Sequence, residues 1–206
     1  MSKWQKEKRL VLEASQKILE KGLVVGTSGN VSLRLPPENN SKLLAITPSR
    51  QYYDLLTIDD IPIINFEGET VEGNLTPSVE TMLHIGIYQM RKDVNAVIHT
   101  HSVFASALSV AGLEIPAILD EQITFLGGEI KLAKYALSGS QELVRNVLAT
   151  LEERNGVLLA NHGVVGVGRT MRDALTACEL VERTAKVYLL ALMAGKVNPL
   201  PVREQK

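Results

Sequence analysis

The chain has 206 residues, of which 45% are hydrophobic, and a formal net charge of -1. This length favours one domain, and the apolar fraction excludes disorder as the main state. Lys and Arg total 22 against 23 Asp and Glu, so the composition gives no electrostatic footprint for nucleic acid or an acidic membrane surface. We expect one domain over residues 1–206, with neither nucleic acid nor a membrane as partner.

Cysteine usage and the N-terminus bear on the compartment. The single cysteine, Cys178, excludes an intramolecular disulfide and fits a reducing cytoplasm. The charged start MSKWQKEKRL lacks the apolar segment of a signal peptide. The longest apolar stretch, around residues 187–195, is shorter than the ~20 residues that a membrane span needs. These features predict a cytoplasmic protein in which any metal is held by His and carboxylates.

The first half of the chain predicts two helices with strands between them. Apolar residues at helical spacing predict a helix over residues 3–21, ended by Gly22. Thr76 and Pro77 predict a second helix that runs to about Met90, with Thr76 as its N-cap. Between the helices, segments with strand-like patterns lie at 31–35, 43–47, 61–65 and 70–71, the first two joined as a hairpin by PPENNSK.

The second half alternates strands and helices. Strands are expected at 95–102, near 128–132 and on both sides of the tight turn 161–163. Helices are expected at 103–112, at 141–154 and in a long final segment that Thr170 and Asp173 cap and Gly195 ends. These elements predict a mixed α/β domain whose central, largely antiparallel sheet is flanked by helices.

Three of the four histidines form a possible metal site. On a strand, residues two apart project from one face about 6.6 Å apart, so His99 and His101 can reach one ion. The same pattern also fits two buried imidazoles without metal. His162 lies in the Asn-His-Gly turn, which can aim a third nitrogen into a cleft or be only a turn. Three ligands with an open position are typical of catalytic rather than structural zinc.

Glu80 and several hydroxyl-rich stretches could also carry chemistry. Near the start of the predicted helix, Glu80 is favoured in its ionised form by the helix dipole. His84 shares its helix face and is interpreted either as an orienting group or as a structural histidine. Three stretches could each hold an anion, although each is also compatible with an ordinary turn: GTSGN at 26–30, TPS at 47–49 and TPS at 76–78.

Together these stretches resemble the class II aldolase family, also called the aldolase/adducin family, which includes fuculose-phosphate aldolases and ribulose-phosphate epimerases. The likeness covers nearly the whole chain through GTSGNVS, ITPS, PSVETMLHIGIYQMRKDVNAVIHTHS, IPAILDEQITFLGG, NHGVVGVG and DALTACELVERTAKVYL. It implies a three-layer α/β/α fold and a homotetramer with active sites at subunit junctions.

The resemblance also implies roles for individual residues. Zn2+, or another divalent cation such as Mn2+ or Co2+, is expected on His99, His101 and His162. Glu80 stands at the position of the family's catalytic acid/base. The implied phosphate-binding residues are Thr27, Gly29, Asn30, Ser49 and Ser78.

The chain departs from fuculose-phosphate aldolases at positions that bear on the substrate. Val79 and Arg50 replace a serine and a glycine, and the tail LPVREQK contains no tyrosine. Asp120 stands where those aldolases have a catalytic tyrosine. Glu121 is placed like the acid/base glutamate of related dehydratases, which however lack a carboxylate at the position of Glu80. Asp120 or Glu121 is expected to handle the proton on the departing aldehyde's oxygen.

These residues predict a metal-dependent aldolase that cleaves or forms a ketose phosphate through a zinc-stabilised ene-diolate, with a sugar phosphate and an aldehyde as its small-molecule partners. Glu80 would protonate the carbanion in the cleavage direction. One alternative is an epimerase, dehydratase or decarboxylase of a phosphosugar on the same metal site. Another is a non-enzymatic, adducin-like interaction module, against which the three histidines and Glu80 count.

Overall fold

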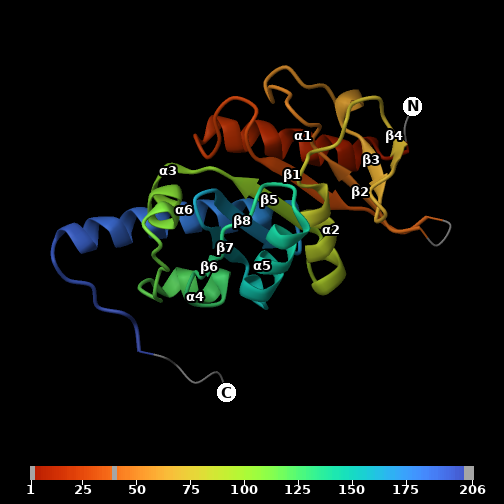
Figure 1. Cartoon of the computed structure of the whole chain (residues 1–206). Coiled ribbons are helices and arrows are strands. Elements are labelled where there is room, and N and C mark those ends of the chain that lie inside the picture. Colours follow the sequence, from red (N-terminus) through yellow and green to blue (C-terminus); the bar gives the residue numbers. More distant parts are fainter. Residues whose placement is uncertain (1–2, 39–40, 202–206) are drawn as a thin grey trace.

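The computed structural model describes residues 3–38 and 41–201, and the strands within these ranges form one sheet (Figure 1). They are β1 (Asn30–Arg34), β2 (Leu43–Ile46), β3 (Ile63–Asn65), β4 (Thr70–Glu72), β5 (Ala96–Thr100), β6 (Leu132–Ala133), β7 (Gly156–Leu159) and β8 (Gly163–Gly168). Their order is β4-β3-β2-β1-β5-β8-β7-β6. All neighbours pair antiparallel except β6 and β7, so the predicted, mostly antiparallel sheet is confirmed.

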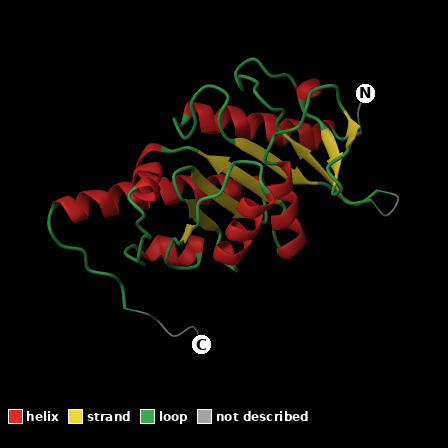
Figure 2. Ribbon diagram, viewed as in Figure 1, coloured by secondary structure: helices red, strands yellow, loops and turns green. Residues whose placement is uncertain are grey.

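Helices cover both faces of this sheet (Figure 2). They are α1 (Gln5–Glu20), α2 (Thr81–Met90), α3 (Val103–Val110), α4 (Asp120–Leu126), α5 (Gln141–Leu151) and α6 (Met171–Met193), with a short 3-10 turn at Ile58–Asp60. Buried side chains of α2 and α5 pack on one face. Those of α1, α3, α4 and α6 pack on the other. The single-domain, three-layer α/β/α arrangement is therefore confirmed.

The alternation of side chains along β5 decides which layer the histidines meet. Val97 packs in the cluster with α2 and α5, whereas Ala96 and Ile98 pack in the cluster with α1. Successive strand residues point to opposite faces, so His99 points to the same side as Val97. This places its imidazole in the layer that contains the start of α2.

Helix α2 begins at Thr81, four residues later than predicted. The prediction of Thr76 as its N-cap is wrong, because Glu80 holds that position. Residues 76–78 instead pair antiparallel with residues 47–49 through a bridge between their central prolines. Two backbone hydrogen bonds of 2.8 and 3.2 Å flank this bridge. Capping signals are local, and here a tertiary pairing outweighs them.

Other differences lie in the second half. Helix α4 was not expected, and the strand expected near 128–132 is β6. The helix expected at 141–154 ends at Leu151, because Glu152 takes a φ of 49°, outside the helical region. Residues 39–40 of the PPENNSK loop and 202–206 of the predicted tail lie outside the described residues. In the described ranges, every helix is too short or too polar to traverse a lipid bilayer.

Candidate active site

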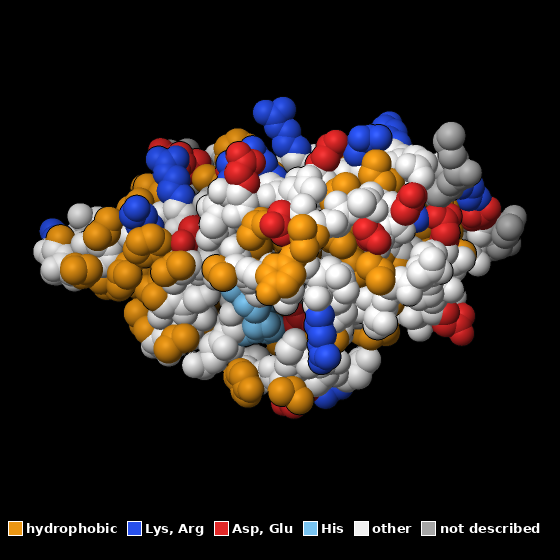
Figure 3. Space-filling view, turned by 90° about the horizontal axis from the view of Figure 1, so that it is seen from above, with side chains coloured by type: hydrophobic (Ala, Val, Ile, Leu, Met, Phe, Trp, Pro, Cys, Tyr) orange, Lys and Arg blue, Asp and Glu red, His pale blue; other side chains and the backbone are white. Residues whose placement is uncertain are grey.

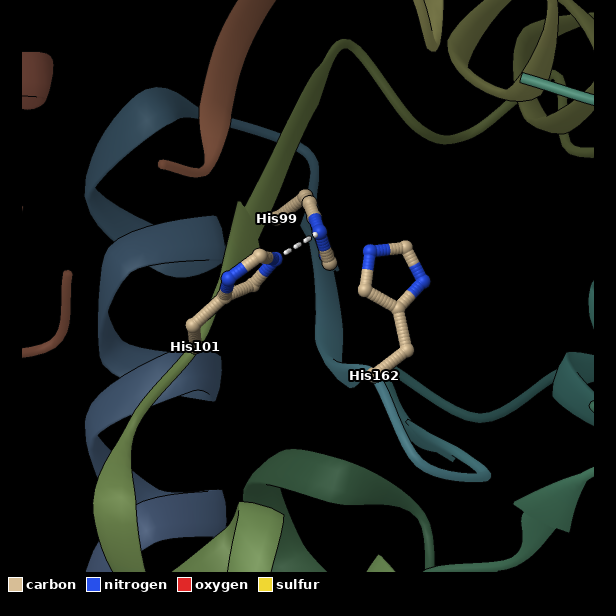
Figure 4. Close-up of side chains that lie close together, drawn as sticks. All are labelled: His99, His101 and His162. Atoms are coloured by element: carbon tan, nitrogen blue, oxygen red, sulfur yellow. Dashed lines mark hydrogen bonds between the residues drawn. The ribbon is translucent and has the colours of Figure 1, made fainter. Parts of the chain in front are cut away.

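Three histidines meet at one end of the central strands. His99 lies on β5, which ends one residue before His101, and His162 lies in the turn between β7 and β8. Their ring centroids are 4.7 to 5.0 Å apart, and one nitrogen of each ring lies within 4.8 Å of the others. Figure 4 shows the three side chains gathered in this way. The structure thus brings together the residues that the sequence suggested as metal ligands.

The turn that carries His162 depends on its two neighbours. Asn161 adopts a φ of 54°, a left-handed conformation that asparagine tolerates better than most residues. Gly163 lies so close to β5 that a Cβ atom there would stand 2.2 Å from the carbonyl oxygen of Thr100. The absence of a side chain in Gly163 lets β8 approach β5 closely and sets His162 against the other two rings.

Hydrogen bonds fix how His99 presents its nitrogens. Its Nδ1–H donates to the backbone carbonyl of Val164 at 2.8 Å, which leaves the Nε2 lone pair free for a ligand bond. The Nε2 atoms of His99 and His101 face each other at 2.8 Å, marked by the dashed line in Figure 4. Two nitrogens on one tetrahedral zinc ion lie about 3.3 Å apart. The pair therefore lies close to the spacing that chelation requires.

The protonation of the other two rings also suits metal binding. Burial, followed by the field of His99, lowers the pKa of His101 and of His162 to about 4. At neutral pH both imidazoles are unprotonated, which is the form that binds a metal. Three nitrogen donors, two of them on residues that line a pocket, fit a divalent cation at a catalytic rather than a closed structural site.

Glu80 lies directly beside the histidines. As the N-cap residue of α2, it turns its side chain toward them: Oε2 is 3.3 Å from Nε2 of His99, and Oε1 is 3.6 Å from Nε2 of His162. Asn30 Nδ2 donates to Oε2 at 2.9 Å, and the Ser138 hydroxyl donates to Oε1 at 2.9 Å. Each carboxylate oxygen is thus held by one neutral donor and lies near one imidazole.

This environment keeps Glu80 ionised. Burial by itself would raise the pKa of the carboxyl group, since only 3% of the residue is exposed. The electrostatic effect of His99 and His162, together with the hydrogen bonds to both oxygens, outweighs burial and lowers the pKa to about 2. Glu80 therefore stands at neutral pH as an anion that can accept a proton.

A pocket of about 230 Å³ opens beside Glu80, His101 and His162. Figure 3 shows histidine side chains in a hollow on this face of the molecule. All the residues that the sequence suggested for phosphate binding line it: Thr27, Gly29, Asn30, Ser49 and Ser78. The paired segments 47–49 and 76–78 form part of its wall. The pocket therefore places hydroxyl and amide groups next to the histidines.

Arg50 gives this pocket a cation. Among the described residues that line it, Arg50 alone carries a full positive charge at neutral pH. Its φ of 58° is left-handed, a conformation that costs a residue with a side chain about 1–2 kcal/mol. In the sequence, Arg50 is distinguished only as a departure from a glycine of the fuculose-phosphate aldolases. Its place in the pocket puts its charge within reach of an anionic ligand that would bind there.

Asp120 and Glu121 are not brought to this pocket. Both belong to the first turn of α4, where Asp120 is exposed and Glu121 forms an ion pair of 2.7 Å with Arg183 on α6. Neither is among the described residues that line the pocket. Their predicted role on the aldehyde's oxygen stays a prediction, and it requires a site shared with another subunit.

Sequence reasoning missed Ser138, which contacts Glu80. A signal was present, because Ser138-Gly139-Ser140 precedes α5 and is a hydroxyl- and glycine-rich stretch like the three that were singled out. Gly139 has a φ of 76°, and a Cβ atom there would lie 3.0 Å from the carbonyl oxygen of Val79. This close approach brings the Ser138 hydroxyl to the carboxylate.

Comparisons with known proteins agree with this fold and identify the family. The family described as Class II Aldolase and Adducin N-terminal domain matches residues 9–189. The chain is 33% identical to 5-deoxy-D-ribulose 1-phosphate aldolase of Bacillus thuringiensis serovar kurstaki, over 98% of this chain and 93% of that protein. It is 35% identical to L-fuculose phosphate aldolase of Escherichia coli strain K12, over 94% and 86%.

A solved structure is similar as well. One described as L-fuculose 1-phosphate aldolase superposes with a TM-score of 0.89 at 34% identity, over 98% of this chain and 92% of that one. The chain therefore belongs to the class II aldolase and adducin family. These relatives are named aldolases, that is, aldehyde-lyases of the class II family, and they act on sugar phosphates.

Proposed function

We propose that this chain is a divalent-metal-dependent aldolase that cleaves, or in reverse forms, the C3–C4 bond of a small ketose 1-phosphate. The observation that carries the proposal is the meeting, in one pocket, of three converging imidazoles, an ionised glutamate and a set of hydroxyl and amide groups. The relatives named above are aldolases of 5-deoxyribulose and fuculose phosphates, which supports this substrate class.

His99, His101 and His162 would hold the cation, which we propose to be Zn2+, with Mn2+ or Co2+ as alternatives. A divalent ion there supplies Lewis-acid polarisation of substrate oxygens and stabilises negative charge as it develops. The protein's own contribution is the arrangement of the rings: Val164 orients His99, and burial keeps His101 and His162 neutral.

Glu80 would move the proton at C3. When the C3–C4 bond breaks, C3 keeps the electron pair and must take up a proton, while the hydroxyl on C4 gives up its proton as the aldehyde forms. In synthesis, the ionised Glu80 would remove this proton from C3. In cleavage, the carboxylate would first take up a proton from water and then give it to C3, while the proton of the C4 hydroxyl passes to another base and returns to water. The Glu80 carboxylate is held by Asn30 and Ser138, so its oxygens already lie beside the cation-binding rings.

The remaining pocket residues would bind the phosphate. Thr27, Ser49 and Ser78 supply hydroxyl or amide donors, and Arg50 supplies a charge. Asp120 or Glu121 would take the proton from the aldehyde's oxygen only if another subunit brings α4 to the pocket, which is why we also propose a homotetramer with shared sites.

Product analysis tests the proposed function. Purified protein with one equivalent of Zn2+ is incubated with 5-deoxyribulose 1-phosphate, 5-methylthioribulose 1-phosphate or fuculose 1-phosphate, and dihydroxyacetone phosphate is followed by its enzymatic reduction with NADH. We expect dihydroxyacetone phosphate and one equivalent of aldehyde from at least one substrate. Release of CO2, loss of water or epimerisation without cleavage would contradict the proposal.

Two substitutions test the division of roles. Glu80→Gln is expected to lose turnover but keep metal, because the amide preserves shape while losing the proton-accepting oxygen. His101→Ala is expected to lose both, because one of three ligands is gone. Metal content of the two proteins, measured after dialysis, separates these effects, and equal metal loss in both would refute the assignment of Glu80.

A further inference from the structure

A line of buried polar side chains leads from the core to Glu80. The Tyr88 hydroxyl lies 2.7 Å from Ser32 Oγ, which lies 2.6 Å from His84 Nδ1. On the other side of the ring, His84 Nε2 lies 2.5 Å from Asn30 Oδ1. Asn30 Nδ2 then reaches Glu80 Oε2 at 2.9 Å. Residues of this line are between 0 and 4% exposed, and only Asn30 and Glu80 among them line the pocket.

The ionised end fixes the direction of every bond in this line. The Glu80 carboxylate can only accept, so Asn30 donates an amide N–H and its carbonyl oxygen faces His84. That oxygen can only accept, so His84 carries its proton on Nε2. Nδ1 then accepts from the Ser32 hydroxyl, which in turn accepts from Tyr88. All four donors point toward the active site.

The Glu80 carboxylate on one side and the Nε2–H of His84 on the other favour the same orientation of the Asn30 amide. If the amide turned by 180°, its NH2 group would meet the Nε2–H of His84 and its oxygen would meet the Glu80 carboxylate. Both contacts would be repulsive, two donors in one case and two acceptors in the other. A buried polar atom left without its partner is strongly destabilising, because it has lost its hydrogen bonds to water without replacement. The turned orientation is therefore strongly disfavoured.

The surroundings of His84 keep it in the form that this line needs. The ring is fully buried, and burial lowers its pKa to about 3, so it is neutral at physiological pH. A neutral imidazole offers one donor and one acceptor, and both are used, by Asn30 and Ser32 respectively. A purely structural histidine would need only hydrogen-bond partners for its two ring nitrogens. His84 is in addition connected, through Asn30, to Glu80, the proposed proton carrier.

We propose that His84 is a positioning residue for Glu80, acting through Asn30: its Nε2–H tautomer holds the Asn30 amide so that the amide clamps one oxygen of the carboxylate. The inference rests on the proposed function, in which Glu80 moves the proton at C3. A freely rotating glutamate side chain loses conformational entropy when it is held in one orientation, and displacement of a reacting group by about 1 Å can cost 100-fold in rate. The second clamp, from Ser138, holds the other oxygen.

Two substitutions at position 84 separate positioning from packing. Gln can place an N–H donor near the site of Nε2, whereas Leu has a similar volume and cannot donate. We expect His84→Gln to keep kcat within a few-fold and His84→Leu to lose about 10- to 100-fold, with KM and bound metal unchanged in both. Tyr88→Phe, at the far end of the line, is a matched control expected to keep kcat. Equal loss in the Gln and Leu variants, or loss that tracks only their unfolding midpoints, would overturn the proposal.

Two measurements keep the inference testable without turnover. In protein labelled with 15N-histidine, His84 should show the Nε2–H tautomer; the Nδ1–H tautomer would overturn the inference. In a crystal structure of His84→Leu, the Asn30 amide and the Glu80 carboxylate should be displaced, and an unchanged Glu80 would likewise overturn it. If the wild-type protein cleaves no sugar phosphate, the proposed function fails, yet these two measurements still decide whether His84 orients Glu80.

Discussion

Gly163→Ala tests how far the site depends on the close approach of β8 to β5. Gly163 has a φ that any residue can adopt, so the cost of the added methyl group comes from contact alone. Its Cβ atom would lie 2.2 Å from the Thr100 carbonyl oxygen and 2.9 Å from Cδ2 of His101. Ordinary contacts begin near 3.4 Å, so the two backbones must separate by about 1 Å.

This separation lowers the free energy of unfolding substantially, because both strands are central in the sheet. Overpacking of a well-packed interior costs about 1–3 kcal/mol, and a lost ladder hydrogen bond adds about 1 kcal/mol. We expect a loss of about 3 kcal/mol in the free energy of unfolding, or roughly 10 °C in Tm for a domain of this size. Metal bonds tolerate shifts of only about 0.2 Å, so zinc affinity should fall by at least 10- to 100-fold.

The assay combines denaturant unfolding in EDTA with zinc titration against a competing chelator. Gly156→Ala on β7 is the matched control, because its Cβ atom would meet only side-chain atoms, at 2.7 Å from Cγ2 of Val181 and 3.5 Å from Leu126. That variant should lose stability but keep wild-type zinc affinity. If Gly163→Ala binds zinc as tightly as the wild-type protein, the reasoning about this turn is refuted.

Three further predictions follow from single residues. Arg50→Gly should raise KM for the sugar phosphate about tenfold, because a charged hydrogen bond is lost, while stability stays equal or rises because glycine tolerates the φ of 58°; an unchanged KM would exclude Arg50 from phosphate binding. Burial raises the pKa of the Cys178 thiol to about 12, so iodoacetamide at pH 8 should label it only after denaturation, and rapid labelling of the folded protein would contradict this. Burial also lowers the pKa of His84 to about 3, so between pH ~6.5 and ~3 the unfolded chain takes up a proton that the folded chain does not. The free energy of unfolding of the metal-free protein, measured by urea titration, should therefore fall as pH drops. In His84→Gln this free energy should fall less steeply, by up to ~1.4 kcal/mol per pH unit. Equal pH slopes in the two proteins would show that His84 is protonated in the folded state.

Local patterns were enough to predict the elements that carry the histidines. The strand around His99 and the turn at His162 depend on side-chain alternation and on turn-forming residues, both of which act over a few neighbouring positions. The start of α2 could not be predicted in this way. Its apparent cap at Thr76 was used instead in pairing with a segment almost thirty residues earlier in the chain, which no local signal reveals.

The contacts made by Glu80 were also beyond sequence reasoning. Asn30 meets Glu80 because the register of β1 against β5 sets Asn30 opposite His99. A shift of one residue would turn the Asn30 side chain to the other face of the sheet. The sequence indicated the residue types of the site, but the register that joins them is a property of the whole sheet. Asp120 and Glu121 show the converse, since family resemblance suggested a role that one chain alone does not assemble.

The two Thr-Pro-Ser segments, 47–49 and 76–78, have a consequence for how this pocket can change over evolution. The two segments are held together by backbone hydrogen bonds on either side of the paired prolines, so the pairing does not depend on the flanking side chains. Proline has no backbone N–H, which prevents the pairing from extending into a longer pair of strands. If Ser49 and Ser78 bind the substrate as proposed, replacing a serine or its neighbour there would alter what the pocket recognises while the supporting wall stays intact. A wall of this kind would allow the enzyme to acquire new substrates through single amino-acid substitutions, while its fold stays the same.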